Sequence, residues 1–288
     1  MTATHTLRVP GAQLHYEVRG AGPLLLIMGS PMEAEAFASL ADALASDHTV
    51  VTHDPRGISG STLDDPDEDT LPDRRADDVA AILDALGADT ADVFGSSGGA
   101  VTGLALVARH PDRVRTLVAH EPPVMEILPD AAEQRAKTED IIETFHKEGQ
   151  GAAWMKFMAV AGFVTEDGES AESGEGGEGG EGGEGGENAP DGPFGEPTEQ
   201  DLANGARFFG HDLRGTARYV PDIAALTAAP TRVLVGVGAE SQGLITYRTS
   251  TVLAELLGTR PVEFPGDHAG FLGDPKGFAE ALRNTLTS

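Results

Sequence analysis

The sequence predicts an α/β fold with a mostly parallel central sheet covered by helices on both faces. Short apolar runs alternate with amphipathic runs of helical spacing up to about residue 123, and the alternation returns near residue 230. The run Pro23–Met28 is apolar throughout, as expected for a strand buried on both faces. The predicted strands are residues 7–10, 14–18, 23–28, 49–52, 90–94, 114–119, 230–238 and 261–264.

Helices are predicted between most of these strands. In residues 72–86 apolar side chains recur at i, i+3, i+4 and i+7, and Gly87 ends the run. The other helices predicted for this part of the chain are residues 33–45, 100–109, 247–257 and 275–286. The first two predicted strands flank Gly11 and indicate a hairpin at the start of the sheet.

The alternation stops between residues 124 and 221, where the sequence has helical runs but no buried strand. The three predicted helices are residues 128–148, 152–163 and 198–213. An all-helical insertion in an alternating chain indicates a cap over the carboxyl edge of the sheet. We therefore expect a core made of residues 1–123 and 222–288, and a helical cap made of residues 124–221.

A Glu-Gly-Gly repeat, Glu175 to Gly186, lies inside the expected cap. Dense glycine with unbroken negative charge cannot bury enough apolar surface to offset chain entropy, so we expect a disordered loop at about residues 166–197. The simplest interpretation is a neutral loop expansion. An acidic brush that repels anionic substrates from the cap is the alternative.

Composition excludes several classes of function. Residues 166–199 hold twelve of the acidic side chains, and without them the net charge of −27 becomes −15. The sequence has no basic stripe that would indicate nucleic acid or an anionic membrane as a partner. The absence of cysteine excludes disulfides and thiol chemistry, and no histidine spacing predicts a metal site. We expect no cofactor and a cytoplasmic protein, with homo-oligomer formation left open.

The stretch Asp92–Ala100 carries the strongest functional signal. Gly95, Ser97 and Gly99 form G-x-S-x-G at the junction of a predicted strand and a predicted helix. A serine on such a turn is pushed out of the backbone, and the first N–H groups of the helix favour the anion formed when it attacks a carbonyl. Ser97 is therefore the candidate nucleophile.

Several landmarks together resemble the α/β-hydrolase superfamily, in its serine-nucleophile members with a helical cap. Besides the Ser97 turn, they are the Met28-Gly29-Ser30-Pro31 turn, the Asp54-x-x-Gly57-x-x-Gly60-Ser61 loop and Gly266-Asp267-His268. The resemblance covers nearly all of the chain outside residues 166–197. His120-Glu121-Pro122-Pro123 and Gly266–Gly270 together resemble a group of actinobacterial hydrolases.

The resemblance implies a Ser-His-acid triad and an oxyanion hole. His268 would accept the proton of Ser97, and the backbone N–H groups of Ser30 and Gly98 would bind the oxyanion. Many members have His-Gly where this chain has Met28-Gly29, so the oxyanion turn must be held in another way. His53 and His120 fall outside the expected order of serine, acid and histidine.

The acid has two candidates. Glu240 follows the penultimate strand, where the family usually places its acid, and is the first choice. Glu121 follows the strand after the Ser97 helix, a position that some relatives use instead. The site is expected to take a small-molecule acyl substrate, lined by Met28, Trp154 and Phe157, although the two aromatic residues also have the spacing of helix-packing positions.

The leading hypothesis is a serine hydrolase that cleaves a small ester, thioester or lactone through an acyl-enzyme. Two alternatives stay open: a perhydrolase or cofactor-free haloperoxidase-like activity on the same triad, and a ligand-binding protein with little turnover. Ser97 disfavours epoxide hydrolases and haloalkane dehalogenases, because these use a carboxylate nucleophile.

Overall fold

The computed structural model describes residues 2–164 and 197–288. Nine strands among these residues form one sheet. Its strands are β1 (Ala3–Val9), β2 (Ala12–Gly20), β3 (Leu24–Met28), β4 (Thr49–His53), β5 (Thr62–Leu63), β6 (Ala91–Ser96), β7 (Val114–His120), β8 (Arg232–Gly238) and β9 (Val262–Phe264). The order is β1-β2-β4-β3-β6-β7-β8-β9, with β5 beside β2. β2 is antiparallel to β1, β4 and β5, and all pairs from β4 to β9 are parallel. The expected mostly parallel α/β architecture is confirmed.

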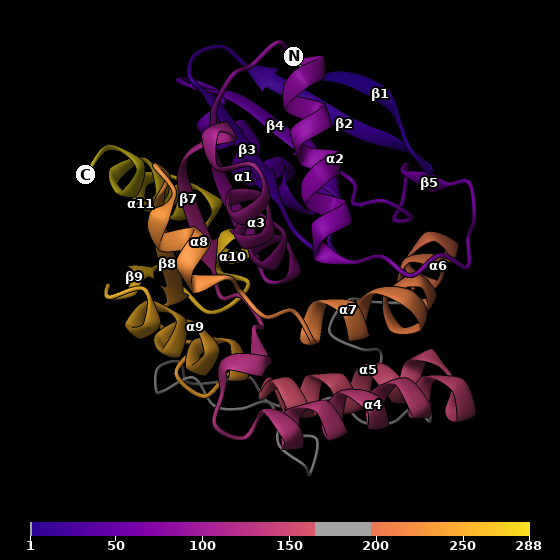
Figure 1. The fold of residues 1–288 in the computed structure, drawn as a ribbon. Helices are drawn as coiled ribbons and strands as arrows, with labels where there is room; N and C mark the ends of the chain where they lie inside the picture. The colour runs from indigo at the N-terminus through magenta and orange to yellow at the C-terminus, as the bar shows by residue number, and fades with distance from the viewer. Residues whose placement is uncertain (1, 165–196) are drawn as a thin grey trace, which may run out of the picture.

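Helices cover both faces of this sheet (Figure 1). In β3, Leu25 and Ile27 join one apolar cluster while Leu26 and Met28 join the other, because successive side chains of a strand point to opposite faces. The first face is covered by α1 (Ala38–Leu44), α10 (Gly270–Gly273) and α11 (Pro275–Thr287). The second is covered by α2 (Pro72–Ala85), α3 (Gly98–Arg109), α8 (Ile223–Ala228) and α9 (Ile245–Leu256).

The inserted cap consists of four described helices that lie together on one side of the core (Figure 1). They are α4 (Ala131–Glu148), α5 (Gln150–Ala161), α6 (Glu199–Arg207) and α7 (Leu213–Ala217). A π-helical turn, Phe208–Asp212, joins α6 to α7 where the sequence predicts one continuous helix. The Glu-Gly-Gly repeat and its expected disorder lie outside the described residues, and the exact cap boundaries stay a prediction.

Aromatic rings form the interior of the cap. Trp154 is stacked on Phe208, with ring centroids 5.6 Å apart, and meets Phe209 edge-on at 4.8 Å. Phe157 is edge-on to both Trp154 and Phe208. Such pairs stabilise beyond the area that they bury, by about 0.5–1.5 kcal/mol each. The helix-packing interpretation of Trp154 and Phe157 therefore accounts for their positions.

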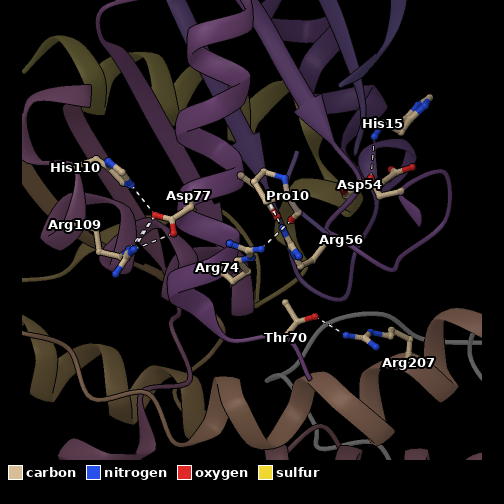
Figure 2. Close-up of polar contacts among 12 residues, drawn as sticks. Pro10, His15, Asp54, Arg56, Thr70, Arg74, Asp77, Arg109, His110 and Arg207 are labelled. Carbon is tan, nitrogen blue, oxygen red and sulfur yellow. Dashed lines mark hydrogen bonds and ion pairs between the residues drawn. The ribbon is translucent and has the colours of Figure 1, made fainter. Parts of the chain in front are cut away.

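Three cap side chains, Asn204, Arg207 and Asp212, hold the cap to the core, and we call them the cap anchor. Asn204 exchanges two hydrogen bonds with Ser59, accepting from its N–H at 2.9 Å and donating to its Oγ at 2.8 Å. Arg207 donates to Thr70, the residue that precedes α2 by two positions (Figure 2). Asp212 lies fully buried, 2.8 Å from Nη2 of Arg75 in α2.

Charge is thus buried at the cap–core boundary. Arg75 and Arg207 are 2% and 7% exposed, and both face Asp212. Burial raises the pKa of Asp212, although the two guanidinium groups act in the opposite direction. Breaking a buried pair by removing one partner typically costs about 3–5 kcal/mol, so the anchor fixes where the cap sits.

Three short helices and a short strand were not predicted from the sequence: α7 beyond Leu213, α8, α10 and β5. Each has six residues or fewer, too few for periodicity to reveal. Among the described residues, none of the helices combines the length and apolarity needed to cross a membrane.

Candidate active site

Ser97 lies between β6 and α3 in a strained backbone conformation. Its φ and ψ are 55° and −124°, a region that side chains other than glycine rarely adopt. Its N–H donates to the carbonyl of His120 at 2.9 Å, while its own carbonyl accepts from Ala100 and Val101 in the first turn of α3. Gly99 allows the close approach of this turn to β3, because a Cβ there would lie 2.3 Å from the carbonyl oxygen of Met28.

The two residues expected to supply the oxyanion hole lie side by side. A Cβ at Gly98 would lie 2.7 Å from the carbonyl oxygen of Ser30 and 2.9 Å from its Cβ. Only glycine at position 98 therefore leaves room for the Ser30 turn. The structure brings the backbone of Ser30 to the N-terminus of α3, next to Ser97.

The carboxylate of Asp54 links the segment that follows the Ser30 turn to the loop after β4. Asp54, just after β4, accepts the N–H of Ala34 at 2.8 Å through Oδ1 and the N–H of Gly60 at 2.9 Å through Oδ2. Phe37 packs against the turn from the other side, since a Cβ at Gly29 would lie 2.8 Å from its ring. Asp54 thus ties the segment after Ser30 to Gly60 in the loop that follows β4.

His268 follows β9 and is paired with a glutamate. Its Nδ1 lies 2.6 Å from Oε2 of Glu121, and its side chain is 14% exposed. A carboxylate on Nδ1 fixes the ring orientation and leaves Nε2 as the nitrogen available for proton transfer. Glu121 sits directly after β7, so His268 and the Ser97 turn share the His120–Glu121 dipeptide as a neighbour.

Glu121 is fully buried and accepts three hydrogen bonds. Oε1 accepts the N–H of Gly238 at 2.8 Å, and Oε2 accepts the hydroxyl of Thr246 at 2.8 Å in addition to His268. Burial acts to raise the pKa of Glu121, but the hydrogen bond and charge of His268 prevail and lower it to about 2. The carboxylate is therefore ionised at neutral pH despite its burial.

The first-choice acid from the sequence, Glu240, does not pair with His268. Its side chain is exposed at the end of the β8 turn, and its N–H donates to the carbonyl of Gly266 at 3.0 Å. The partner position is occupied by the second candidate, Glu121. The turn of Glu121, with φ of 49°, brings its carboxylate under the loop that carries His268, whereas the chain after Gly238 leads Glu240 outward.

Two further histidines lie at strand ends, and both are buried. His120 hydrogen-bonds through Nδ1 to Oγ of Ser96 at 3.2 Å, and its ring lies 6.2 Å from that of His268. Burial lowers the pKa of both His120 and His53 to about 4, so both are neutral near pH 7. Their burial separates them from bulk solvent.

The expectation that Met28 lines the substrate site is not met. Its side chain is 1% exposed and packs in the core cluster with α3. Side chains alternate between the two faces along β3, and this alternation directs Met28 into the interface between the sheet and α3. Trp154 and Phe157 are partly buried among the cap aromatics, and a substrate contact for them stays a prediction.

The sequence missed two residues of this site. Thr246 in α9 supports Glu121, but nothing in the sequence relates a threonine in a late helix to a glutamate 125 positions earlier. Phe163, two residues after α5, has its ring 5.7 Å from that of His268. Among residues 2–164 and 197–288, no group of three His, Asp or Glu side chains is arranged to hold a metal ion.

Comparison with known proteins shows the family to which the chain belongs. The uncharacterized hydrolase YraK of Bacillus subtilis (strain 168) is 33% identical over 286 residues, which cover 98% of this chain and 95% of YraK. The family model described as alpha/beta hydrolase fold matches residues 22–153. This chain belongs to the α/β-hydrolase family.

Solved structures of the family share the whole fold. An esterase from Thermogutta terrifontis superposes with a TM-score of 0.70 at 19% identity, covering 100% of this chain and 98% of its own. The enol-lactonase from Burkholderia xenovorans LB400 has a TM-score of 0.62 at 17% identity, covering 99% and 100%. The family model and the similarity to YraK show a hydrolase of the α/β family, and esterases and lactonases are among its structural neighbours.

Proposed function

We propose that the protein is a serine hydrolase that cleaves a carboxylic ester, thioester or lactone through an acyl-enzyme, with Ser97, His268 and Glu121 as its triad. The observation that carries the proposal is the buried Glu121 on Nδ1 of His268, at the sheet edge where Ser97 occupies its strained turn. If the Glu121–His268 pair were uncharged, or lay elsewhere on the fold, it would give no reason to expect catalytic turnover.

Each group has a role that follows from its surroundings. His268, through Nε2, takes the proton of Ser97 as Oγ bonds to the carbonyl carbon. Glu121 keeps the other ring nitrogen protonated and stabilises the imidazolium that forms. The N–H groups of Ser30 and Gly98 donate to the oxygen that becomes negative, and the two residues lie against one another.

Two further steps complete acylation and then regenerate the enzyme. The tetrahedral intermediate collapses as His268 gives its proton to the leaving alcohol or thiol, which leaves an ester between Ser97 and the acyl group. Water, activated by His268, then attacks that ester and releases the acid. No cofactor enters this sequence of steps.

Covalent labelling tests the proposal. A fluorophosphonate probe should label the wild-type protein at Ser97, because the probe needs an activated serine, and Ser97→Ala should not be labelled. In parallel, p-nitrophenyl esters and lactones of graded chain length should be hydrolysed by the wild type only. A folded wild-type protein that neither reacts with the probe nor turns over any of these substrates would contradict the proposal.

A further inference from the structure

The cap places one aromatic side chain on the proposed base. The ring of Phe163 lies 5.7 Å from that of His268, centroid to centroid, at an interplanar angle of 61°. Phe163 is only partly buried. The distance and angle are those of an edge-on aromatic pair.

Backbone geometry explains how α5 delivers this ring. Gly162 has φ of 93° and ends the helix, with the N–H groups of Gly162 and Phe163 both donating to the carbonyl of Met158. This left-handed stop turns the chain by a fixed amount and directs the next side chain away from the helix axis. A larger residue at 162 would also collide with the carbonyl of Gly243, at 2.8 Å from its Cβ.

The end of α5 therefore docks on the segment that supports the acid. Gly243 and Leu244 lead directly into α9, and Thr246 at the start of that helix donates to Glu121. Phe163 lies beside the imidazole, and Gly162 packs on the segment that leads to Thr246, the hydroxyl donor of Glu121.

The chemistry of the base identifies what Phe163 would touch. His268 must reach the leaving-group oxygen to protonate it, so the leaving group lies next to the imidazole in the transition state of acylation. A ring packed on the same imidazole borders that group. We propose that Phe163 is a specificity-determining residue for the alcohol part of the substrate, favouring esters whose leaving group is apolar or aromatic.

This inference rests on the proposed acyl-enzyme mechanism, which gives it a distinct kinetic signature. The leaving group is present only during acylation and has departed before water attacks. Loss of the Phe163 ring should therefore weaken acylation by esters with bulky apolar alcohols, and leave hydrolysis of the acyl-enzyme unchanged.

The experiment compares benzyl, phenyl and ethyl esters of one acid with wild type, Phe163→Ala and Phe163→Leu. We expect kcat/KM for the benzyl ester to fall about tenfold relative to the ethyl ester in Phe163→Ala, and less in Phe163→Leu, which keeps an apolar side chain. The rate of acyl-enzyme hydrolysis, measured after the burst, should match the wild type. Phe145→Leu, which removes a ring stacked on Phe209 inside the cap, is the matched control and should leave the benzyl-to-ethyl ratio unchanged.

The outcomes separate this inference from the proposed function. If the wild type hydrolyses the esters but Phe163→Ala lowers all of them equally, or slows acyl-enzyme hydrolysis as well, Phe163 has no selective role and the inference is wrong while the mechanism stands. If Phe145→Leu changes the ratio as much, the effect belongs to cap packing and the inference is also overturned. Wild-type protein without any turnover would overturn both.

Discussion

The ends of β7 and β8 reach the same edge of the sheet, and each is followed by a glutamate. At the β7 end, Glu121 is fully buried, accepts three hydrogen bonds and holds His268. At the β8 end, Glu240 comes two residues after Gly238 and extends into solvent. The two carboxylates have the same chemistry and opposite environments.

The difference shows that the donors gathered around a carboxylate distinguish the proposed triad acid from a solvated glutamate. The β8 end does contribute to the pair, but with the N–H of Gly238 and, from the following helix, the hydroxyl of Thr246. One strand end supplies the carboxylate, and the other supplies two of its three donors, while His268 is the group that lowers its pKa most.

The sharpest test exchanges each carboxylate for an amide. Glu121→Gln should lower kcat/KM by about 10³–10⁴-fold, because an amide N–H facing Nδ1 favours the tautomer of His268 that cannot accept the Ser97 proton. Glu240→Gln is the matched control and should stay within about twofold of the wild type, since the side chain is exposed. Ester hydrolysis by the two purified variants, with folding verified by circular dichroism, decides between them. The reverse ranking would return the acid to the β8 end.

A smaller effect should follow from removing one support of Glu121. Thr246→Val keeps the shape of the side chain but deletes the hydroxyl that donates to Oε2, and a hydrogen bond to a charged group contributes about 1.5–3 kcal/mol. We expect a loss of that order in unfolding free energy and a fall of about tenfold in kcat/KM. Thr246→Ser restores the donor and should recover most of both. Equal losses in the two variants would indicate that the methyl group, rather than the hydroxyl, matters.

A further effect lies in the acid dependence of stability. The pKa of Glu121 falls from 4.5 to about 2 on folding, so the unfolded chain binds the proton more readily between these values. The stability contributed by the ionised carboxylate is complete above about pH 4.5 and declines as the pH falls toward 2. The difference in unfolding free energy between wild type and Glu121→Gln should therefore narrow from about pH 6 to about pH 3, as measured by urea denaturation. A difference that stays constant over this range would contradict the assignment of the lowered pKa to Glu121.

Much of the fold could be predicted because its signals are local. Buried strands and amphipathic helices alternate along the chain, and the Ser97 and His268 motifs each lie within a few residues. The acid could not be decided in this way, because the donors of Glu121 come from positions 238, 246 and 268. The prediction that Met28 lines the substrate site was wrong for a related reason. Because β3 is buried on both faces, its sequence does not reveal toward which face each side chain points.

The cap anchor also constrains how this enzyme could be recombined with its relatives. A chimera that received a foreign cap without the equivalents of Arg207 and Asp212 would leave Arg75 as an isolated charge in the interior, at a cost of about 3–5 kcal/mol. Crossover points chosen for such chimeras should therefore move Arg75 together with the cap, or replace it by leucine in the same step.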